Sequence, residues 1–227
     1  MKANGGDAGG GAMTVTNGVV LEARGVHKAY GRRQVLSGAD LAVRAGQLVA
    51  VVGENGYGKS TLLRILAGTL AADRGEVRVT GTVGYCPQDP VVNDSLTVGQ
   101  HLRYFAAARR LASLERADEL LGLLRFGQFK DQAAGALSGG IRQKLNLTLA
   151  LLHDPDVLLL DEPYQGFDWE TYLRFWDVVG DLRGRGKAIV VITHLVFEQC
   201  RFDMLTSLSQ GQLTPHDMPA EDPHDSH

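Results

Sequence analysis

The chain has 227 residues, and its 23 lysines and arginines against 26 aspartates and glutamates give a formal charge of −3. This near-neutral balance argues against a protein that binds nucleic acid through a basic face, and hydrophobic residues at 44% are enough for a core without disulfides. The two cysteines, Cys86 and Cys200, indicate a reducing compartment, and we expect both to be small buried hydrophobes.

Both ends of the chain are predicted to be disordered. Residues 1–17 form a glycine-rich leader and residues 214–227 an acidic tail, and neither has the apolar residues that a packed core needs. The N-terminus lacks the apolar stretch of a secretory signal, and no apolar run approaches the roughly 20 residues that cross a bilayer. We therefore expect a cytoplasmic protein that reaches a membrane only by binding a protein that spans it.

Between these ends, short apolar strands alternate with amphipathic helices. Residues 48–52 are a continuous apolar run that ends in Gly53, as expected of a strand buried on both faces. The predicted strands are residues 19–23, 41–43, 48–52, 76–80, 83–85, 157–160, 188–192, 204–208 and 212–213. The predicted helices are residues 59–68, 139–152, 169–182 and 196–200. This alternation predicts an α/β core with a mostly parallel sheet.

Residues 97–134 have a different character. Leucines, alanines and Phe105 recur there at helical intervals, with arginines and glutamates between them, and no strand signal occurs. The segment therefore predicts a helical insert within the α/β core.

The first functional motif follows the buried strand 48–52. Its sequence GENGYGKS fits the phosphate-loop pattern G-x-x-x-x-G-K-[ST], and it opens a predicted helix, which is the context that the motif requires. Glycines let backbone N–H groups face a phosphate, the helix N-terminus favours an anion, Lys59 reaches the β- and γ-phosphates, and Ser60 is a Mg²⁺ ligand. The predicted ATP-binding residues are Gly53, Glu54, Asn55, Gly56, Tyr57, Gly58, Lys59, Ser60 and Thr61.

The carboxylates that such a site needs stand at the end of another apolar strand. Asp161 and Glu162 follow residues 157–160, and the carboxyl ends of parallel strands face the ligand crevice. Asp161 is predicted to hold Mg²⁺ through water and Glu162 to polarise the attacking water. An Asp-Glu pair after a strand can also be a helix cap, and it is the phosphate loop that favours the catalytic interpretation.

A second serine- and glycine-rich helix start lies at residues 137–143, LSGGIRQ. It is a further anion site, which makes sense if it serves a nucleotide held by another copy of the subunit. With these motifs, residues 19–213 resemble the ATP-binding cassette (ABC) ATPases. Residues 137–143 are similar to that family's signature sequence, and the order of phosphate loop, signature and Asp161-Glu162 is very specific.

The resemblance implies a P-loop ABC ATPase fold over residues 18–213, with an N-terminal antiparallel β region and a helical subdomain at about residues 89–140. It also implies further site residues that isolated side chains would not reveal. These are Tyr30, stacking on adenine; Gln88, touching Mg²⁺ and sensing the membrane partner; Asp168, contacting the dimer partner; and His194, contacting the γ-phosphate.

Three positions depart from the family's usual residues. The family usually has a small residue at the position of Tyr57, where the backbone amide nevertheless remains available to phosphate. We expect the ring to point outward, toward a facing subunit, and to modulate closure of the dimer. Tyr164 and Phe167 are larger than the family's usual Thr and Leu, but Asp168 is kept, and the site is predicted to be active.

The implied cycle places two ATP molecules between two cassettes, each touching the phosphate loop of one copy and Ser138, Gly139 and Gly140 of the other. Glu162 orients water, hydrolysis removes the bridging phosphate, and the dimer opens. Because all motifs are in one chain, a homodimer is favoured.

The resemblance implies a membrane permease that the ATPase powers. We expect this permease to be a separate chain, which places the present subunit on the inner face of the cell membrane. Residues 96–106 look like a segment of drug-, lipid- and polysaccharide-exporting ATPases, which favours export. An importer subunit, a non-transport ABC protein and a non-hydrolysing regulator are the alternatives.

Overall fold

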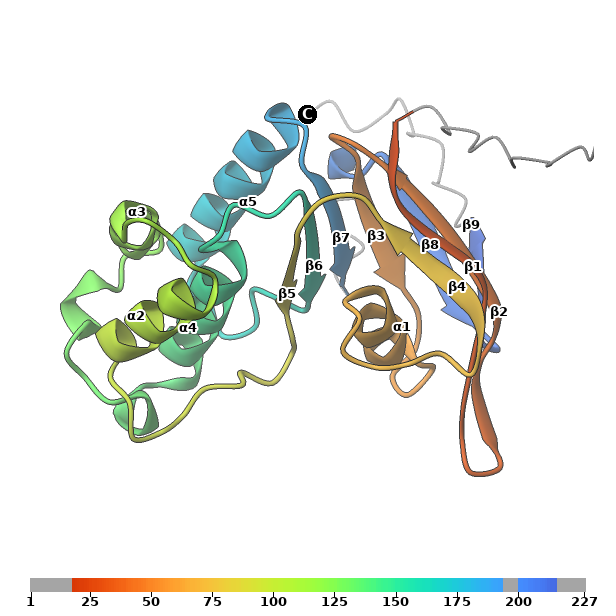
Figure 1. Cartoon of the computed structure of the whole chain (residues 1–227), viewed down its shortest axis with the longest axis horizontal. Helices are drawn as coiled ribbons and strands as arrows, with labels where there is room; N and C mark the ends of the chain where they lie inside the picture. The colour runs from red at the N-terminus through yellow and green to blue at the C-terminus, as the bar shows by residue number, and fades with distance from the viewer. Residues whose placement is uncertain (1–17, 194–199, 216–227) are drawn as a thin grey trace, which may run out of the picture.

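The computed structural model describes residues 18–193 and 200–215. Two sheets and the helices around them make up this part of the chain (Figure 1). The strands are β1 (Val19–Tyr30), β2 (Arg33–Arg44), β3 (Leu48–Val52), β4 (Arg74–Val79), β5 (Val83–Cys86), β6 (Val157–Asp161), β7 (Ala188–Ile192), β8 (Met204–Ser209) and β9 (Gln212–Pro215). The α-helices are α1 (Lys59–Leu66), α2 (Val98–Ala108), α3 (Glu115–Leu123), α4 (Gly139–Leu151) and α5 (Trp169–Gly184), with 3-10 turns at Gly127–Phe129 and Ala134–Ala136.

The larger sheet has the strand order β5-β6-β7-β3-β8-β9, and only the β8–β9 pair is antiparallel. The smaller sheet, β2-β1-β4, is antiparallel. The predicted α/β fold, with a mostly parallel core sheet and an N-terminal antiparallel region, is thereby confirmed.

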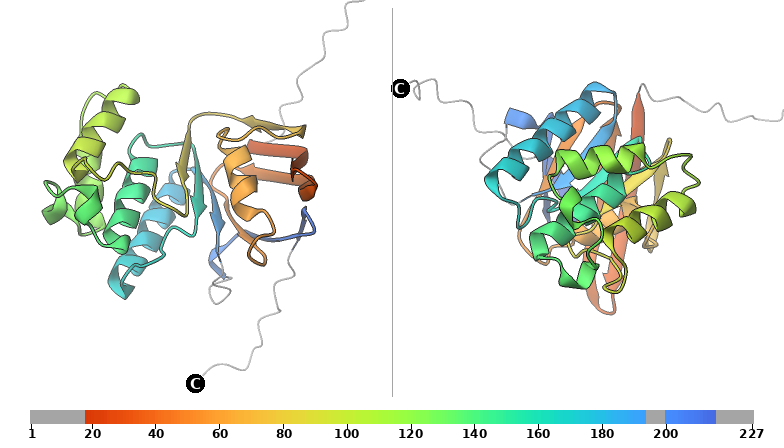
Figure 2. Two further views of the ribbon diagram at one scale, coloured as in Figure 1. Left: turned by 90° about the horizontal axis from the view of Figure 1, so that it is seen from below. Right: turned by 90° about the vertical axis from the view of Figure 1, so that its left-hand side faces the viewer.

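The larger sheet separates two hydrophobic cores, because alternate side chains of its central strands point to opposite faces. On β3, Val49 and Val51 pack with α1 and the smaller sheet, whereas Leu48 and Ala50 pack with α4 and α5. In Figure 2, α2 to α5 gather on one side of the sheet, and α1 and the smaller sheet lie on the other. Burial on both faces explains why the strands read as unbroken apolar runs.

The predicted helical insert is confirmed by α2 and α3, which both contact α4. Thr97 begins α2 with a capping box: its hydroxyl accepts from the Gln100 N–H at 3.1 Å, and the Gln100 side chain accepts from the Thr97 N–H at 2.7 Å. Buried leucines such as Leu102 and Leu120 join the insert to the core on the α4 side. Within residues 18–193 and 200–215, no helix is long and apolar enough to span a membrane.

Several expectations are corrected. The strands predicted at 19–23 and 41–43 are 12 residues each, because β1 and β2 pair along a long hairpin whose register shifts break the alternation of apolar residues. β9 reaches Pro215, into the predicted tail, because it pairs with β8. Cys86 is buried as expected, but Cys200 is exposed. Residues 1–17, 194–199 and 216–227 lie outside the described chain, including most of the helix predicted at 196–200.

Candidate functional site

The predicted phosphate loop and the residues expected around it enclose a cavity of about 530 Å³. It opens where β3 and β6 end, the position at which an α/β sheet binds ligands. Its lining residues are Tyr30, Arg33, Val35, Asn55, Gly56, Gly58, Lys59, Ser60, Thr61, Gln88 and Glu162. Of the predicted residues, Gly53, Glu54 and Tyr57 belong to the loop but do not line the cavity.

The phosphate loop holds its own lysine. The Lys59 ammonium donates to the Gly53 carbonyl at 2.7 Å and to the Glu54 carbonyl at 3.0 Å, and the side chain is only 6% exposed. Burial lowers the pKa of Lys59, and the carboxylates of Glu162 and Asp161 oppose that shift. The ammonium is therefore held at the N-terminus of α1. There it can exchange its hydrogen bonds to two backbone carbonyls for bonds to phosphate oxygens.

The loop also depends on glycine at its end. Gly58 caps α1 with φ +98, in the left-handed region that side chains rarely adopt, and a Cβ there would collide with the Val35 side chain. The contact with Val35 joins the loop to β2, and a larger residue at Gly58 would push the two apart.

Asp161 has the character of a metal ligand. The side chain is 2% exposed and hydrogen-bonded to Ser60, and its Oδ1 atom has no hydrogen-bond partner within the part of the chain that is described. Burial raises the pKa of Asp161, the Ser60 hydroxyl opposes the shift, and Glu162 adds to it. A buried, unpartnered carboxylate oxygen beside a hydroxyl fits a hard cation such as Mg²⁺, which takes oxygen ligands.

Glu162 is held in an uncommon conformation. Its φ of +48 lies in the left-handed region, and its N–H donates to the Ile192 carbonyl at the end of β7, at 3.2 Å. Gln88 Nε2 donates to Glu162 Oε2 at 3.2 Å. The glutamine and the glutamate that the sequence analysis placed at the reaction centre are thus in contact.

The signature residues lie elsewhere. Ser138 caps α4, accepting from the Ile141 N–H at 3.4 Å, and neither it nor Gly139 or Gly140 lines the cavity. A Cβ on Gly140 would collide with the Gly166 carbonyl, so the start of α4 touches the loop that leads to α5.

Asp168 caps α5. Its carboxylate accepts from the N–H and the hydroxyl of Thr171, each at 2.9 Å, and these bonds lower the pKa of Asp168. Lys144, buried on α4, donates to the same Thr171 hydroxyl at 2.8 Å. The end of the loop that leads into α5 is thereby fastened to α4.

His194 lies outside the described residues, but its neighbour Thr193 is hydrogen-bonded to the Tyr164 hydroxyl. The unusually large Tyr164 therefore connects the loop before α5 to the end of β7.

Tyr57 is 37% exposed and lines a separate hollow of about 250 Å³ with Ser37 and Gln210.

Arg33 also lines the cavity, although it was not predicted as a site residue, and its Nη2 donates to the Gly56 carbonyl at 2.7 Å. An arginine in a hairpin turn belongs to no motif, and only the packing of β2 against the phosphate loop reveals it. Gln143 and Asn146 on α4 were missed as well; both are buried polar residues inside an apolar helix, which is the one signal that marks them.

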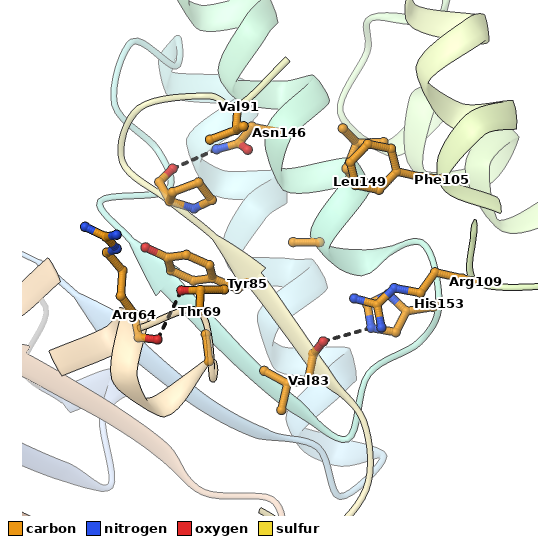
Figure 3. A pocket seen from close by; sticks show the side chains of 13 residues that line it. Arg64, Thr69, Val83, Tyr85, Val91, Phe105, Arg109, Asn146, Leu149 and His153 are labelled. Atoms are coloured by element: carbon orange, nitrogen blue, oxygen red, sulfur yellow. Dashed lines mark hydrogen bonds between the residues drawn. The ribbon is translucent and has the colours of Figure 1, made fainter. Parts of the chain in front are cut away.

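A groove of about 500 Å³ lies beside the segment that carries Gln88 (Figure 3). Apolar side chains line most of it, including Val91, which is 77% exposed. Figure 3 shows Arg64 on one side of the groove and Arg109 next to His153 on the other. Its lining residues are Arg64, Ala67, Thr69, Val83, Tyr85, Pro87, Val91, Phe105, Arg109, Asn146, Leu149, Ala150 and His153.

Several proteins with similar sequences are named as ATP-binding proteins, in agreement with the phosphate-loop cavity. A Nod factor export ATP-binding protein of Ralstonia nicotianae is 32% identical, over 88% of this chain and 68% of its own length. An aliphatic sulfonates import ATP-binding protein of Nocardia farcinica is 35% identical, over 87% and 81%. For ABC transporter G family member 20 of Dictyostelium discoideum, which is 29% identical, the chain spans only 30% of the relative's length.

Solved structures resemble the whole described chain. An ATP-binding subunit of an ABC transporter superposes with a TM-score of 0.80 at 26% identity, covering 86% of this chain and 88% of that one. A dimeric bacterial ABC transporter cassette has a TM-score of 0.78 at 24% identity, covering 85% and 96%, and supports the fold. The family model described as ABC transporter matches residues 36–165, more than half of the chain. The chain belongs to the ABC transporter family, as one of its ATP-binding ATPase cassettes.

Proposed function

We propose that this chain hydrolyses ATP to power a transporter whose membrane permease is a separate protein. The observation that carries the proposal is the meeting of Lys59, Gln88 and Glu162 in one cavity, with Asp161 and Ser60 hydrogen-bonded beside them. A cation, a carboxylate for the attacking water and a pair of oxygen ligands for Mg²⁺ are the parts that phosphoryl transfer to water requires.

The residues divide the chemistry between them. Tyr30 stacks on the adenine, and Lys59 exchanges the Gly53 and Glu54 carbonyls for the β- and γ-phosphate oxygens. Ser60, Gln88 and, through water, Asp161 would hold Mg²⁺. When bound, Mg²⁺ neutralises the charge that develops on the phosphate oxygens. Glu162 orients the attacking water while Gln88 keeps its carboxylate in place, and His194 contacts the γ-phosphate.

A second copy of the chain completes the site. Ser138, Gly139 and Gly140 present a capped helix start that is suited to phosphate but stands outside this copy's cavity. A two-fold homodimer brings the signature of each copy over the ATP of the other, with Asp168 at the contact. The likeness of the fold to a dimeric cassette supports this arrangement.

The groove beside Gln88 is where we place the permease. It is mostly apolar, with Arg64 and Arg109 among its lining residues, and Tyr85 and Pro87, which also line it, belong to the segment that leads into Gln88. A permease segment seated there would place the chain on the inner, cytoplasmic face of the membrane.

Export is the direction we propose. Residues 96–106, which include the start of α2, resemble the corresponding segment of exporting ATPases, and the Ralstonia relative is named for Nod factor export. The Nocardia relative, named for sulfonate import, favours the alternative of an importer subunit.

One experiment tests the proposal as a whole. The Glu162→Gln variant keeps the shape of the side chain but cannot activate water, so Mg-ATP should trap a dimer that retains its nucleotide. Capture of this variant from solubilised native membranes should bring down a polytopic partner without its own cassette, and Glu119→Gln on α3 is the control. A soluble partner, or turnover at the wild-type rate, would contradict the proposal.

A further inference from the structure

Two buried amide side chains on α4 face the loops that carry the reaction centre. Gln143 and Asn146 are 3% and 5% exposed, and their spacing of three residues puts them on the same side of the helix. The side chains around them on α4 are mostly leucines, so two amides at this depth need partners. Those partners lie on two different loops.

Asn146 holds the loop that leads to Gln88. Its Nδ2 donates to the Pro87 carbonyl at 2.7 Å and contacts the Cys86 sulfur at 3.2 Å and Gln143 Oε1 at 3.4 Å. Figure 3 shows the Asn146 amide beside the groove, with its hydrogen bond drawn to a carbonyl of the neighbouring segment. The Pro87 carbonyl precedes Gln88 directly, so its position sets where the glutamine begins.

Gln143 holds the second loop. Its Nε2 donates to the Pro163 carbonyl at 3.3 Å, and Pro163 follows Glu162 directly. One helix therefore fixes the residue before Gln88 and the residue after Glu162, while those two side chains bond to each other at 3.2 Å. Either carbonyl, buried at Pro163 and part-buried at Pro87, would move to find another partner if it lost its donor, since an unmade hydrogen bond is costly where water has little access.

We propose that Asn146 is a positioning residue for ATP hydrolysis, which keeps Gln88 against Glu162 by holding the Pro87 carbonyl. The inference rests on the proposed function in one respect, that Gln88 and Glu162 act in hydrolysis. Asn146 does not touch the nucleotide cavity, so it acts on the rate of hydrolysis and leaves ATP binding alone.

The test begins with kinetics of the purified full-length chain with Mg-ATP. Asn146→Ala should lower kcat about tenfold, the upper size expected for the loss of one part-buried hydrogen bond, with KM for ATP unchanged. Asn146→Leu keeps the volume, loses the same donor and should behave alike, which keeps the test valid if the alanine variant folds poorly. The matched control is Thr148→Val: Thr148 is a buried polar residue of α4 whose hydroxyl, among the described residues, bonds only within its own helix, to the Lys144 carbonyl at 2.8 Å.

A double-mutant cycle then separates positioning from a general effect on stability. If Asn146 acts through Gln88, the Asn146→Ala and Gln88→Ala double variant should have the kcat of Gln88→Ala alone, whereas Thr148→Val should combine with Gln88→Ala multiplicatively. A kcat of Asn146→Ala equal to that of Thr148→Val, or multiplicative effects with Gln88→Ala, would overturn the inference. Failure of the proposed function looks different, because the wild-type chain itself would then not turn over ATP.

Discussion

Gln88 and Glu162 are 74 residues apart in the chain, yet the Gln88 amide donates to the Glu162 carboxylate at 3.2 Å. The contact follows from the sheet. β5 and β6 are parallel neighbours in which Cys86 pairs with Leu160, so the segments leaving their carboxyl ends emerge side by side. A permease segment in the groove and a nucleotide in the cavity would therefore act on two ends of the same short segment, residues 85–88.

Asp161 is expected to lower the stability of the nucleotide-free fold, because a carboxylate that can bind Mg²⁺ is buried there. Burial raises its pKa in the folded state, so the ionised form destabilises the fold, and this lost stability is regained as the pH falls from the raised pKa toward the pKa of the unfolded carboxyl. Asp161→Asn should therefore raise the Tm of the nucleotide-free protein at pH 7 and flatten this part of the pH profile, while turnover requires far more Mg²⁺. Thermal scans from about pH 3 to 8, which include the usual pKa of an aspartate, measure it; a lower Tm for the variant at pH 7 would contradict the role.

Arg33 is expected to contribute to ATP binding rather than to chemistry. It fixes the Gly56 carbonyl in the cavity wall, and the loss of this hydrogen bond loosens the phosphate loop. Because the side chain is exposed, Arg33→Ala should raise the KM for ATP only about three- to tenfold, with kcat unchanged. Arg32→Ala, at the neighbouring exposed position that does not line the cavity, is the control. An equal rise in KM for both variants would contradict this role, because it would mean that the loss of a positive charge, and not of the hydrogen bond to Gly56, causes the effect.

Tyr57 is expected to bury its ring against the second copy. The ring is partly exposed and is not among the residues that line the cavity, so its removal leaves the backbone amides of the phosphate loop in place. In the Glu162→Gln background with Mg-ATP, Tyr57→Ala should weaken dimerisation about tenfold, as for a large aromatic at an interface. Sedimentation equilibrium measures the Kd, and Leu123→Ala, at an exposed leucine of α3, is the control. Unchanged Kd and turnover would remove Tyr57 from the interface.

Gly140 and Gly139 form a matched pair for the start of α4. A Cβ at Gly140 would collide with the Gly166 carbonyl, whereas a Cβ at Gly139 meets nothing within 4 Å. Gly140→Ala should therefore lower the free energy of unfolding by about 1–3 kcal/mol, and Gly139→Ala should leave it unchanged or raise it by up to about 1 kcal/mol. Urea unfolding measures both; equal effects would show that the loop before α5 does not rest on Gly140.

The sequence alone predicted the features that depend on neighbours in the chain. The phosphate loop was recognised because a buried strand, a glycine-rich turn and a helix follow one another within a few residues. The unbroken apolar runs at β3, β6 and β7 correctly indicated strands covered on both faces. The length of β1 was not predicted, because bulges shift its register with β2 and hide the alternation of apolar side chains.

Only the tertiary structure decided which distant residues share the site. Arg33 reaches the Gly56 carbonyl because β2 passes the phosphate loop, and Asn146 reaches the Pro87 carbonyl because α4 packs on β5. Neither residue stands in a motif, because each bond joins segments that the order of the chain does not place together. A local pattern fixes backbone conformation and burial, whereas hydrogen bonds across the core depend on how sheets and helices pack.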